Sequence, residues 1–235
     1  MKKMFRELKG LAWAVLLSLA LAKAGNAEAE KFHYQLDEQK LWAGGIQVFE
    51  QDYHTEGEGI KKRVVGVMIL KAPPEKVWRG LENWDAMGPF VPGLEYNKTI
   101  QVLEPLGNKN KIGNSLIEGQ LKVLGLGINY TLDVKFDRAN YRQDWSLVSD
   151  DQVERYNQKK IPVKKASRGL KNIEGFEYIE PYGDGSSTIY YYAPIVETSI
   201  PLPGVLQRAL EKTTLNGYMQ GIRKMVNSLD SCEKR

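Results

Sequence analysis

Cysteine and histidine are almost missing from this chain. Its 235 residues include one cysteine, Cys232, and two histidines, His33 and His54. A single thiol excludes an internal disulfide and any cluster of cysteines around a metal. Two histidines, both in the N-terminal quarter, leave little material for a histidine-based metal site. We therefore predict no metal site and no cofactor.

The common catalytic motifs are also missing. The sequence has no Gly-x-Ser-x-Gly elbow, no His-Glu-x-x-His pair and no Walker loop. Acid–base chemistry would have to use carboxylates, tyrosines or lysines. The sequence alone therefore predicts no catalytic residue.

An apolar run near the N-terminus is too short for a spanning helix, which needs about 20 apolar residues. Residues 11–22 form this run, interrupted only by Ser18, after four basic residues and before Ala22-Lys23-Ala24. This layout is typical of a secretory signal peptide, with an uncleaved anchor as the alternative. We predict a signal peptide at residues 1–24, an N-terminal extension at 25–45 and one domain at 46–230. The mature protein would be periplasmic or secreted.

A net charge is lacking once those first 24 residues are set aside. The whole chain has a formal charge of +4, and residues 1–24 hold five basic residues and one acidic residue. The remaining 28 basic and 28 acidic residues balance. A nucleic-acid-binding protein needs a net basic surface, so we expect no nucleic-acid partner.

The rest of the chain is mostly β-structure with a helix near each end. A strand at 60–71 stops at Pro73-Pro74, and a helix at 75–84 follows, with apolar residues at helical spacing. Further strands are predicted at 46–52, 96–103, 114–123, 128–137, 142–148, 175–180 and 188–196, and a long helix at 205–229. Residues 128–137 alternate cleanly between apolar and polar, as in a half-buried antiparallel strand. We predict an α+β fold in which the last helix covers the concave apolar face of a curved antiparallel sheet. Such an arrangement leaves volume for an apolar ligand.

Residues 69–95 resemble the entry signature of the START-like superfamily, which includes polyketide cyclases, birch-allergen-like proteins and coenzyme-Q-binding proteins. In that signature a strand ends at a small residue and proline, a helix carries an aromatic after valine, and a loop carries Phe-x-Pro. The matching residues here are Ala72-Pro73-Pro74, Val77-Trp78 and Phe90-Val91-Pro92. The resemblance implies the helix-grip fold over about residues 46–229. It also implies a cavity for a lipid, a quinone, a sterol-like molecule or a polyketide.

Ten residues are candidates for lining that cavity. Aromatic side chains suit a flat or long apolar ligand, and a tyrosine hydroxyl can hold its polar end, although core packing is the plainer interpretation. Mid-helix glycines cost about 1 kcal/mol each, which indicates close approach to the sheet or ligand, or a loosely packed surface position. A glutamate that alternates with Leu116 faces inward, unless a bulge turns it to solvent. The candidates are Trp84, Phe90, Glu118, Tyr130, Leu132, Trp145, Tyr190, Tyr192, Gly217 and Gly221.

A basic segment at residues 155–171 contains seven Lys and Arg residues and no acid. It is interpreted either as a contact with an anionic membrane or as a solvated hairpin neutralised by flanking acids. The candidates for membrane contact are Lys159, Lys160, Lys164, Lys165 and Arg168.

These features predict an exported binding protein that holds a lipid or another apolar molecule and carries it between membranes. One alternative is an enzyme like polyketide cyclases or aromatases, which a buried carboxylate–tyrosine pair in the cavity would favour. Another is an envelope interaction module whose cavity is filled by its own side chains.

Overall fold

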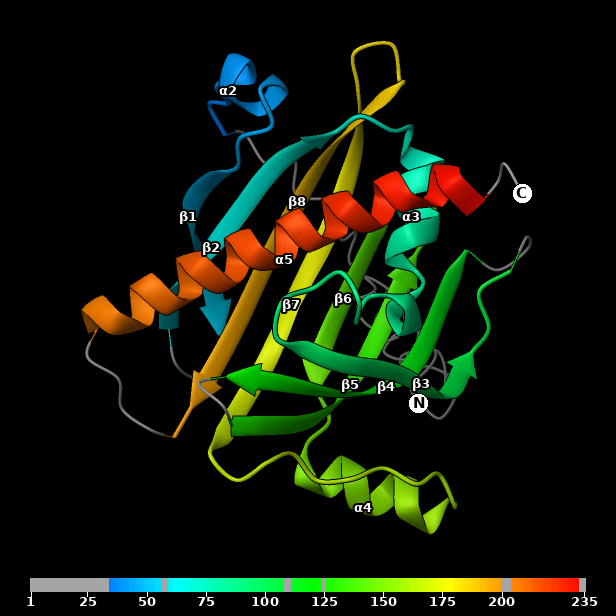
Figure 1. Cartoon of the computed structure of the whole chain (residues 1–235). Coiled ribbons are helices and arrows are strands. Elements are labelled where there is room, and N and C mark those ends of the chain that lie inside the picture. Colours follow the sequence, from blue (N-terminus) through cyan, green and yellow to red (C-terminus); the bar gives the residue numbers. More distant parts are fainter. Residues whose placement is uncertain (1–33, 56–58, 108–110, 124–125, 200–203, 233–235) are drawn as a thin grey trace, which may run out of the picture. The chain divides into compact units, whose positions relative to one another are not determined.

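One antiparallel sheet of eight strands carries the fold, and a long helix lies across it (Figure 1). The computed structural model describes residues 34–55, 59–107, 111–123, 126–199 and 204–232. The predicted signal peptide lies outside the described residues, as do residues 25–33 of the predicted extension. Across the described ranges, none of the helices combines the length and the apolar character that a membrane crossing requires.

The sheet order is β1-β2-β8-β7-β6-β5-β4-β3, and every neighbouring pair is antiparallel. The strands are β1 (Gln47–Thr55), β2 (Gly59–Leu70), β3 (Leu94–Glu104), β4 (Ile112–Val123), β5 (Leu126–Asp137), β6 (Arg142–Leu147), β7 (Leu170–Tyr182) and β8 (Ser187–Thr198). From β3 to β8, each strand lies beside the next strand in the sequence, and β1 and β2 complete the β8 edge. This order brings the two ends of the domain's sequence together in space.

Within the described ranges, four helices and one 3₁₀ turn surround the sheet. They are α2 (Glu38–Trp42), α3 (Pro74–Leu81), η1 (Trp84–Ala86), α4 (Asp150–Gln158) and α5 (Gly204–Cys232). Figure 1 shows α5 crossing the strands, with α3 beside its C-terminal part and α4 beyond the far ends of the strands. The predicted α+β helix-grip fold is therefore confirmed.

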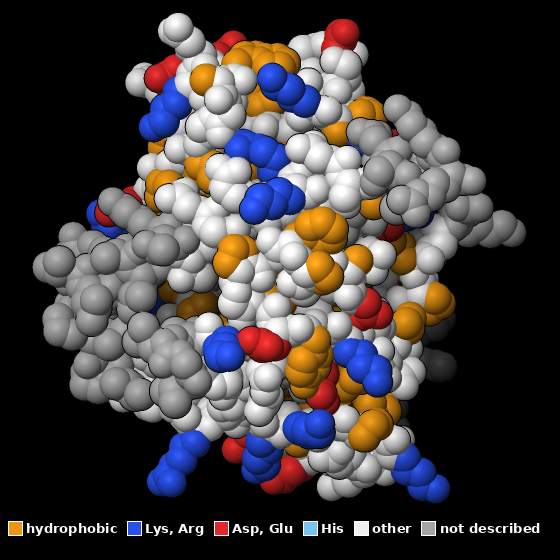
Figure 2. Space-filling model, in the orientation of Figure 1, with side chains coloured by type: hydrophobic (Ala, Val, Ile, Leu, Met, Phe, Trp, Pro, Cys, Tyr) orange, Lys and Arg blue, Asp and Glu red, His pale blue; other side chains and the backbone are white. Residues whose placement is uncertain are grey.

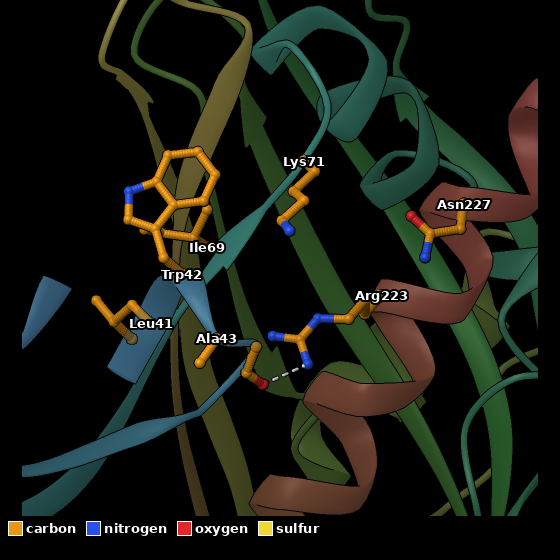
Figure 3. A pocket seen from close by; sticks show the side chains of 8 residues that line it. Leu41, Trp42, Ala43, Ile69, Lys71, Arg223 and Asn227 are labelled. Atoms are coloured by element: carbon orange, nitrogen blue, oxygen red, sulfur yellow. Dashed lines mark hydrogen bonds between the residues drawn. The ribbon is translucent and has the colours of Figure 1, made fainter. Parts of the chain in front are cut away.

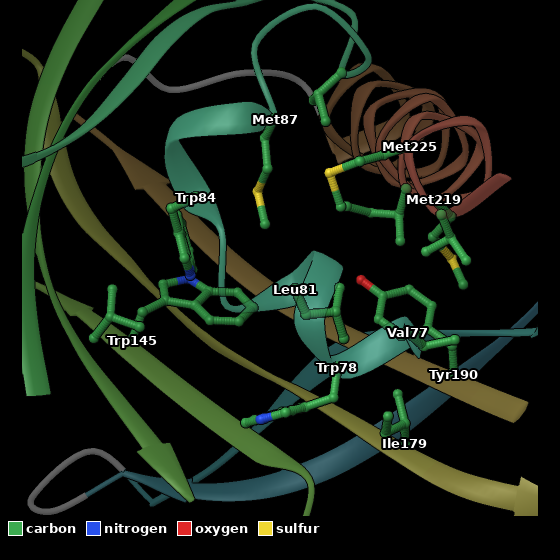
Figure 4. Packing of buried hydrophobic residues seen from close by; sticks show 14 of the residues in the cluster. Val77, Trp78, Leu81, Trp84, Met87, Trp145, Ile179, Tyr190, Met219 and Met225 are labelled. Atoms are coloured by element: carbon green, nitrogen blue, oxygen red, sulfur yellow. The ribbon is translucent and has the colours of Figure 1, made fainter. Parts of the chain in front are cut away.

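The main core lies between the concave face of the sheet and the helices α3 and α5 (Figure 4). Its large fully buried side chains include Trp78 of α3, Tyr190 of β8 and Met219 of α5. The predicted alternation of β5 is confirmed, because Tyr130, Leu132, Val134 and Phe136 all join this core. A smaller cluster lies under α4 on the other face of the sheet and contains Leu116, Val148, Val153 and Val163.

Local sequence explains where α3 begins. Pro73 adopts an extended conformation and Pro74 occupies the first helical turn, where its missing N–H costs nothing. The helix then buries Val77, Trp78 and Leu81 against the core. The turn η1 follows α3 in the chain and places Trp84 in the core as well.

The helix α4 corrects the prediction for the basic segment. The first four residues of the basic segment, Arg155 to Gln158, form the end of this helix and are not part of a hairpin. Ser149 caps the helix by accepting a hydrogen bond from the backbone of Gln152, whose side chain bonds back to the backbone of Ser149. The spacing of Ser149 and Gln152 in the sequence is typical of a capping box. The helix buries only Val153, so its apolar residues show no helical periodicity.

The two glycines of α5 are not equivalent. A Cβ atom added at Gly221 would lie 2.6 Å from the carbonyl oxygen of Phe90, whereas one at Gly217 would meet only the Pro92 side chain, at 3.7 Å. The close approach expected from the sequence is thus present at Gly221, against the loop that carries Phe-x-Pro. At Gly217 the contact is an ordinary one.

This difference predicts opposite effects for the same substitution. Gly221→Ala should lower the free energy of unfolding by about 1–3 kcal/mol, because the backbone of the loop must move. Gly217→Ala should be neutral or raise it by up to about 1 kcal/mol, because alanine favours the helix. Urea unfolding of the two variants measures both effects. Equal effects at the two positions would contradict the packing described here.

Candidate functional site

A carboxyl group lies in the middle of the sheet, on the face that α5 covers. Glu177 is fully buried, with 0% of its surface exposed. It lies on β7, opposite Tyr192 of β8 and Gln143 of β6. Ile179, two positions along the strand, belongs to the main core, so Glu177 points to the same concave side.

Side-chain donors from three elements converge on this carboxyl group. The hydroxyl of Tyr190 donates to Glu177 Oε1 at 2.5 Å, and the hydroxyl of Tyr218 on α5 donates to the same atom at 2.8 Å. The amide of Gln143 donates to Oε2. Gln143 in turn accepts a hydrogen bond from Trp84 Nε1 at 3.2 Å. We call these five residues the Glu177 cluster.

Burial controls the protonation of the cluster. Desolvation raises the pKa of Glu177, and the hydrogen bonds from Tyr190, Tyr218 and Gln143 oppose that rise without cancelling it. Desolvation and the nearby carboxyl group raise the pKa values of Tyr190 and Tyr218 well above the ordinary value of tyrosine. Both tyrosines are therefore neutral hydrogen-bond donors at physiological pH.

Stacked aromatic rings border the cluster. Tyr192 stacks on Tyr218 with ring centroids 4.2 Å apart and planes at 13°. Trp145 also stacks on Tyr192, with ring centroids 5.9 Å apart. Trp84 meets Trp145 edge-on, with ring centroids 5.8 Å apart (Figure 4). We call these four residues the aromatic wall. Tyr192 and Tyr218 are only half-buried, so the wall is incompletely covered by the described residues.

The structure brings together nine of the ten residues predicted to line a cavity. Five of them lie in the main core: Trp84, Tyr130, Leu132, Trp145 and Tyr190. Phe90 and Tyr192 are partly buried against that core. Gly217 and Gly221 lie on α5, against the Phe-x-Pro loop. The hydroxyl of Tyr130 donates to Asn97 Oδ1 at 2.8 Å, so its polar atom is already paired. Contact of these residues with a ligand stays a prediction.

Glu118 does not join the main core, although it shares a small pocket with Tyr130. It shares a face of β4 with Leu116, and Leu116 packs in the cluster under α4. Its Oε1 accepts hydrogen bonds from Tyr96 at 3.0 Å and from Lys164 at 3.2 Å. A small pocket of about 80 Å³ lies beside these groups. Glu118 is thus a partly exposed ion-pair residue on the face opposite to α5, without any bulge between β4 and β5.

The five predicted membrane-contact residues are all exposed, but two of them have acidic partners. Lys164 pairs with Glu118, and Lys165 pairs with Asp150 at 3.2 Å and Glu154 at 3.7 Å. Lys159, Lys160 and Arg168 are exposed as well. Figure 2 shows positive and negative side chains side by side over the α4 end of the molecule. This arrangement weakens the field that a membrane would meet.

Sequence analysis did not identify Glu177, Gln143 or Tyr218 as site residues. A signal for Glu177 was available, because it shares the apolar face of Ile179 by alternation. Both faces of this strand carry apolar residues, however, so alternation did not tell which side α5 covers. Tyr218 lies 41 positions away, and its contact with Glu177 depends on the whole fold.

Comparison with solved structures identifies the same fold in several proteins. A protein from Thermus thermophilus is 17% identical, with a TM-score of 0.52, over 71% of this chain and 98% of that one. A START superfamily protein from Mycobacterium smegmatis is 16% identical, with a TM-score of 0.55, over 71% and 98%. The Zhui aromatase/cyclase from a Streptomyces species is 11% identical, with a TM-score of 0.52, over 78% and 94%. No family model matches the chain, and no curated protein matches it significantly. The chain therefore has a START-like fold, and the likeness extends to the fold alone.

Proposed function

We propose that this protein binds an apolar small molecule between the concave face of the sheet and α5, with the Glu177 cluster holding the molecule's polar end. The observation that carries the proposal is the cluster itself. A few convergent polar groups within an apolar lining are typical of ligand sites. Well-packed apolar residues would stabilise the fold about as well as a buried polar network, so stability alone does not explain the cluster.

The aromatic wall supplies the surface for the ligand. Tyr192 and Tyr218 present half-buried stacked rings next to the cluster, and a flat or chain-like ligand gains free energy by covering them. Tyr218 belongs to both the aromatic wall and the Glu177 cluster, because its hydroxyl donates a hydrogen bond to Glu177 at 2.8 Å. Met87, Met219 and Met225 line the same interior, and methionine side chains adapt readily to a ligand.

We further propose that the protein is exported and carries its ligand between membranes. The layout of residues 1–24 supports export. The exposed Lys159, Lys160 and Arg168 would supply a peripheral contact with anionic lipid. The ligand classes in view are a lipid, a quinone, a sterol-like molecule or a polyketide.

A second candidate is an enzyme that moves protons on a bound apolar substrate. The buried pair of Glu177 and Tyr190, with a 2.5 Å hydrogen bond, favours this candidate. One similar structure is named an aromatase/cyclase. Glu177→Gln separates the two functions, because it would preserve much of a ligand's affinity and remove a proton-transfer group.

The test begins with protein that is expressed in cells and has had access to cellular lipids. The chain starting at Gly25 is purified, extracted with organic solvent and analysed by mass spectrometry. We expect one apolar compound in near-stoichiometric amount. Rebinding of that compound is then measured in Tyr218→Phe and in the matched control Tyr96→Phe, which removes a hydroxyl–glutamate hydrogen bond on the opposite face. Tyr218→Phe should weaken binding several-fold to about tenfold, and Tyr96→Phe should leave it unchanged.

Two outcomes would overturn the proposal. One is folded protein that carries no compound and gains no thermal stability from a broad panel of fatty acids, quinones and sterols. That result would favour an interaction module with a filled interior. The other is binding that Tyr96→Phe weakens as much as Tyr218→Phe, which would assign the ligand to the α4 face.

A further inference from the structure

A second pocket lies at the rim of the sheet, away from the aromatic wall (Figure 3). Its volume is about 240 Å³, below the roughly 300–1,000 Å³ of sites that enclose a drug-sized ligand. The turn after α2, the end of β2 and the C-terminal half of α5 surround it. The lining residues are Leu41, Trp42, Ala43, Gly44, Ile69, Lys71, Arg223 and Asn227. None of them belongs to the Glu177 cluster or to the aromatic wall.

Two cationic side chains point into this pocket. In Figure 3, Lys71 and Arg223 enter from opposite sides, and Asn227 lies beside them. The ammonium of Lys71 lies 5.7 Å from the ring centroid of Trp42. Neither cation forms an ion pair with a carboxylate in the part of the chain that the structure describes. Two like charges in one concave site repel each other unless an anion lies between them.

The guanidinium of Arg223 is incompletely hydrogen-bonded. Its Nη1 donates to the carbonyl oxygen of Gly44 at 2.8 Å and to Gln220 Oε1 at 3.0 Å. Its Nη2 is buried and has no partner among the described residues. Partial burial lowers the pKa of Arg223, because desolvation disfavours the charge. An unpaired N–H on a partly desolvated cation is costly, and an anionic oxygen satisfies both the hydrogen bond and the charge.

We propose that this pocket binds the anionic head of an amphiphile, a carboxylate or a phosphate, through Lys71, Arg223 and the amide of Asn227. The cations provide the charge, and the planar guanidinium suits a group with two oxygens. Leu41, Trp42 and Ile69 form an apolar side on which the first carbons of the chain would lie. The volume fits a head group and a short stem rather than a whole lipid.

The experiment compares three probes, dodecanoate, dodecanol and inorganic phosphate, by calorimetry at low salt. The variants are Lys71→Gln and Arg223→Gln, with Lys224→Gln, an exposed neighbour on α5, as the control. We expect saturable binding of dodecanoate that weakens about tenfold or more in Lys71→Gln and in Arg223→Gln and is unchanged in Lys224→Gln. Dodecanol should bind equally to all four proteins. The side chain of Lys71 is exposed, so Lys71→Gln keeps the test valid even if Arg223→Gln loosens α2.

Binding in this pocket can be distinguished from ligand binding beside Glu177. Tyr218→Phe should leave this dodecanoate binding unchanged, whereas it weakens binding beside Glu177. Phosphate that binds as tightly as dodecanoate, with the same loss in Lys71→Gln, would support the anion site and identify a free anion as its source. Absence of saturable binding by either anion would overturn the proposal. Dodecanoate binding that survives both Lys71→Gln and Arg223→Gln would overturn it as well.

Discussion

Replacing Glu177 by alanine is expected to lower the free energy of unfolding by about 3–5 kcal/mol. The carboxyl group accepts hydrogen bonds from Tyr190, Tyr218 and Gln143, and it is fully buried. Alanine would leave the hydroxyls of Tyr190 and Tyr218 and the amide of Gln143 without an acceptor, at about 1–3 kcal/mol for each donor that water cannot reach. Urea unfolding, followed by tryptophan fluorescence, measures the loss.

Two further variants make this prediction specific. Glu177→Gln keeps one oxygen for both tyrosines, but its amide nitrogen would face the amide of Gln143, so we expect a smaller loss. Glu197→Ala removes a glutamate of β8 that is 40% exposed and pairs with Lys61 on the surface, and its expected cost is below about 1 kcal/mol. A loss for Glu177→Ala no larger than that for Glu197→Ala would show that the cluster does not form in solution.

The raised pKa of Glu177 also determines the sign of a pH effect. In the range between its ordinary pKa and its raised pKa, the folded protein binds a proton that the unfolded chain releases. The stabilising contribution is therefore complete below the ordinary pKa of glutamate and is lost as the pH rises through the raised pKa. Its slope reaches about 1.4 kcal/mol per pH unit for one proton. Subtracting the stability curve of Glu177→Gln from that of the original protein isolates this term, and a flat difference would contradict it.

Much of the fold was predictable, because short sequence patterns determine which face of a strand is buried and where a helix begins. The alternation in β5 gave the correct inner face, since each inward residue is apolar and each outward residue is polar. The Pro73-Pro74 pair correctly marked the start of α3. Helix α2 was missed because it has five residues and buries only Leu41, which leaves no periodic pattern. Helix α4 was missed because charge dominated its composition.

The polar part of the site was less predictable than the aromatic part. Strand alternation predicts the inward position of Tyr130 and Trp145, and alternation can be determined from a single strand. Glu177 requires knowledge of which face meets α5, and its partner Tyr218 comes from the far end of the chain. The carboxylate singled out from the sequence, Glu118, lies on the outer face of β4, whereas Glu177 lies on the inner face of β7. A one-residue difference in phase places a side chain on the opposite face of the sheet.

Trp84 connects the packing of the interior to the cluster, and its loss is the second large effect that we expect. It is 5% exposed, meets Trp145 edge-on and donates to Gln143. Trp84→Ala should lower the free energy of unfolding by about 3–5 kcal/mol through lost burial and the cavity left behind. Trp84→Phe keeps most of the ring contact but leaves Gln143 Oε1 without its donor, so a loss of about 1–3 kcal/mol is expected.

The cavity in Trp84→Ala offers a direct check on where apolar molecules enter. The cavity would lie next to Trp145 of the aromatic wall. Apolar cavities of this kind bind small aromatic molecules. Added indole should therefore raise the melting temperature of Trp84→Ala in a concentration-dependent way and leave that of Trp84→Phe nearly unchanged. The compound extracted from the original protein should compete with indole if it occupies the same interior. Rescue by indole without such competition would place the natural ligand elsewhere, whereas competition would locate it beside the Glu177 cluster.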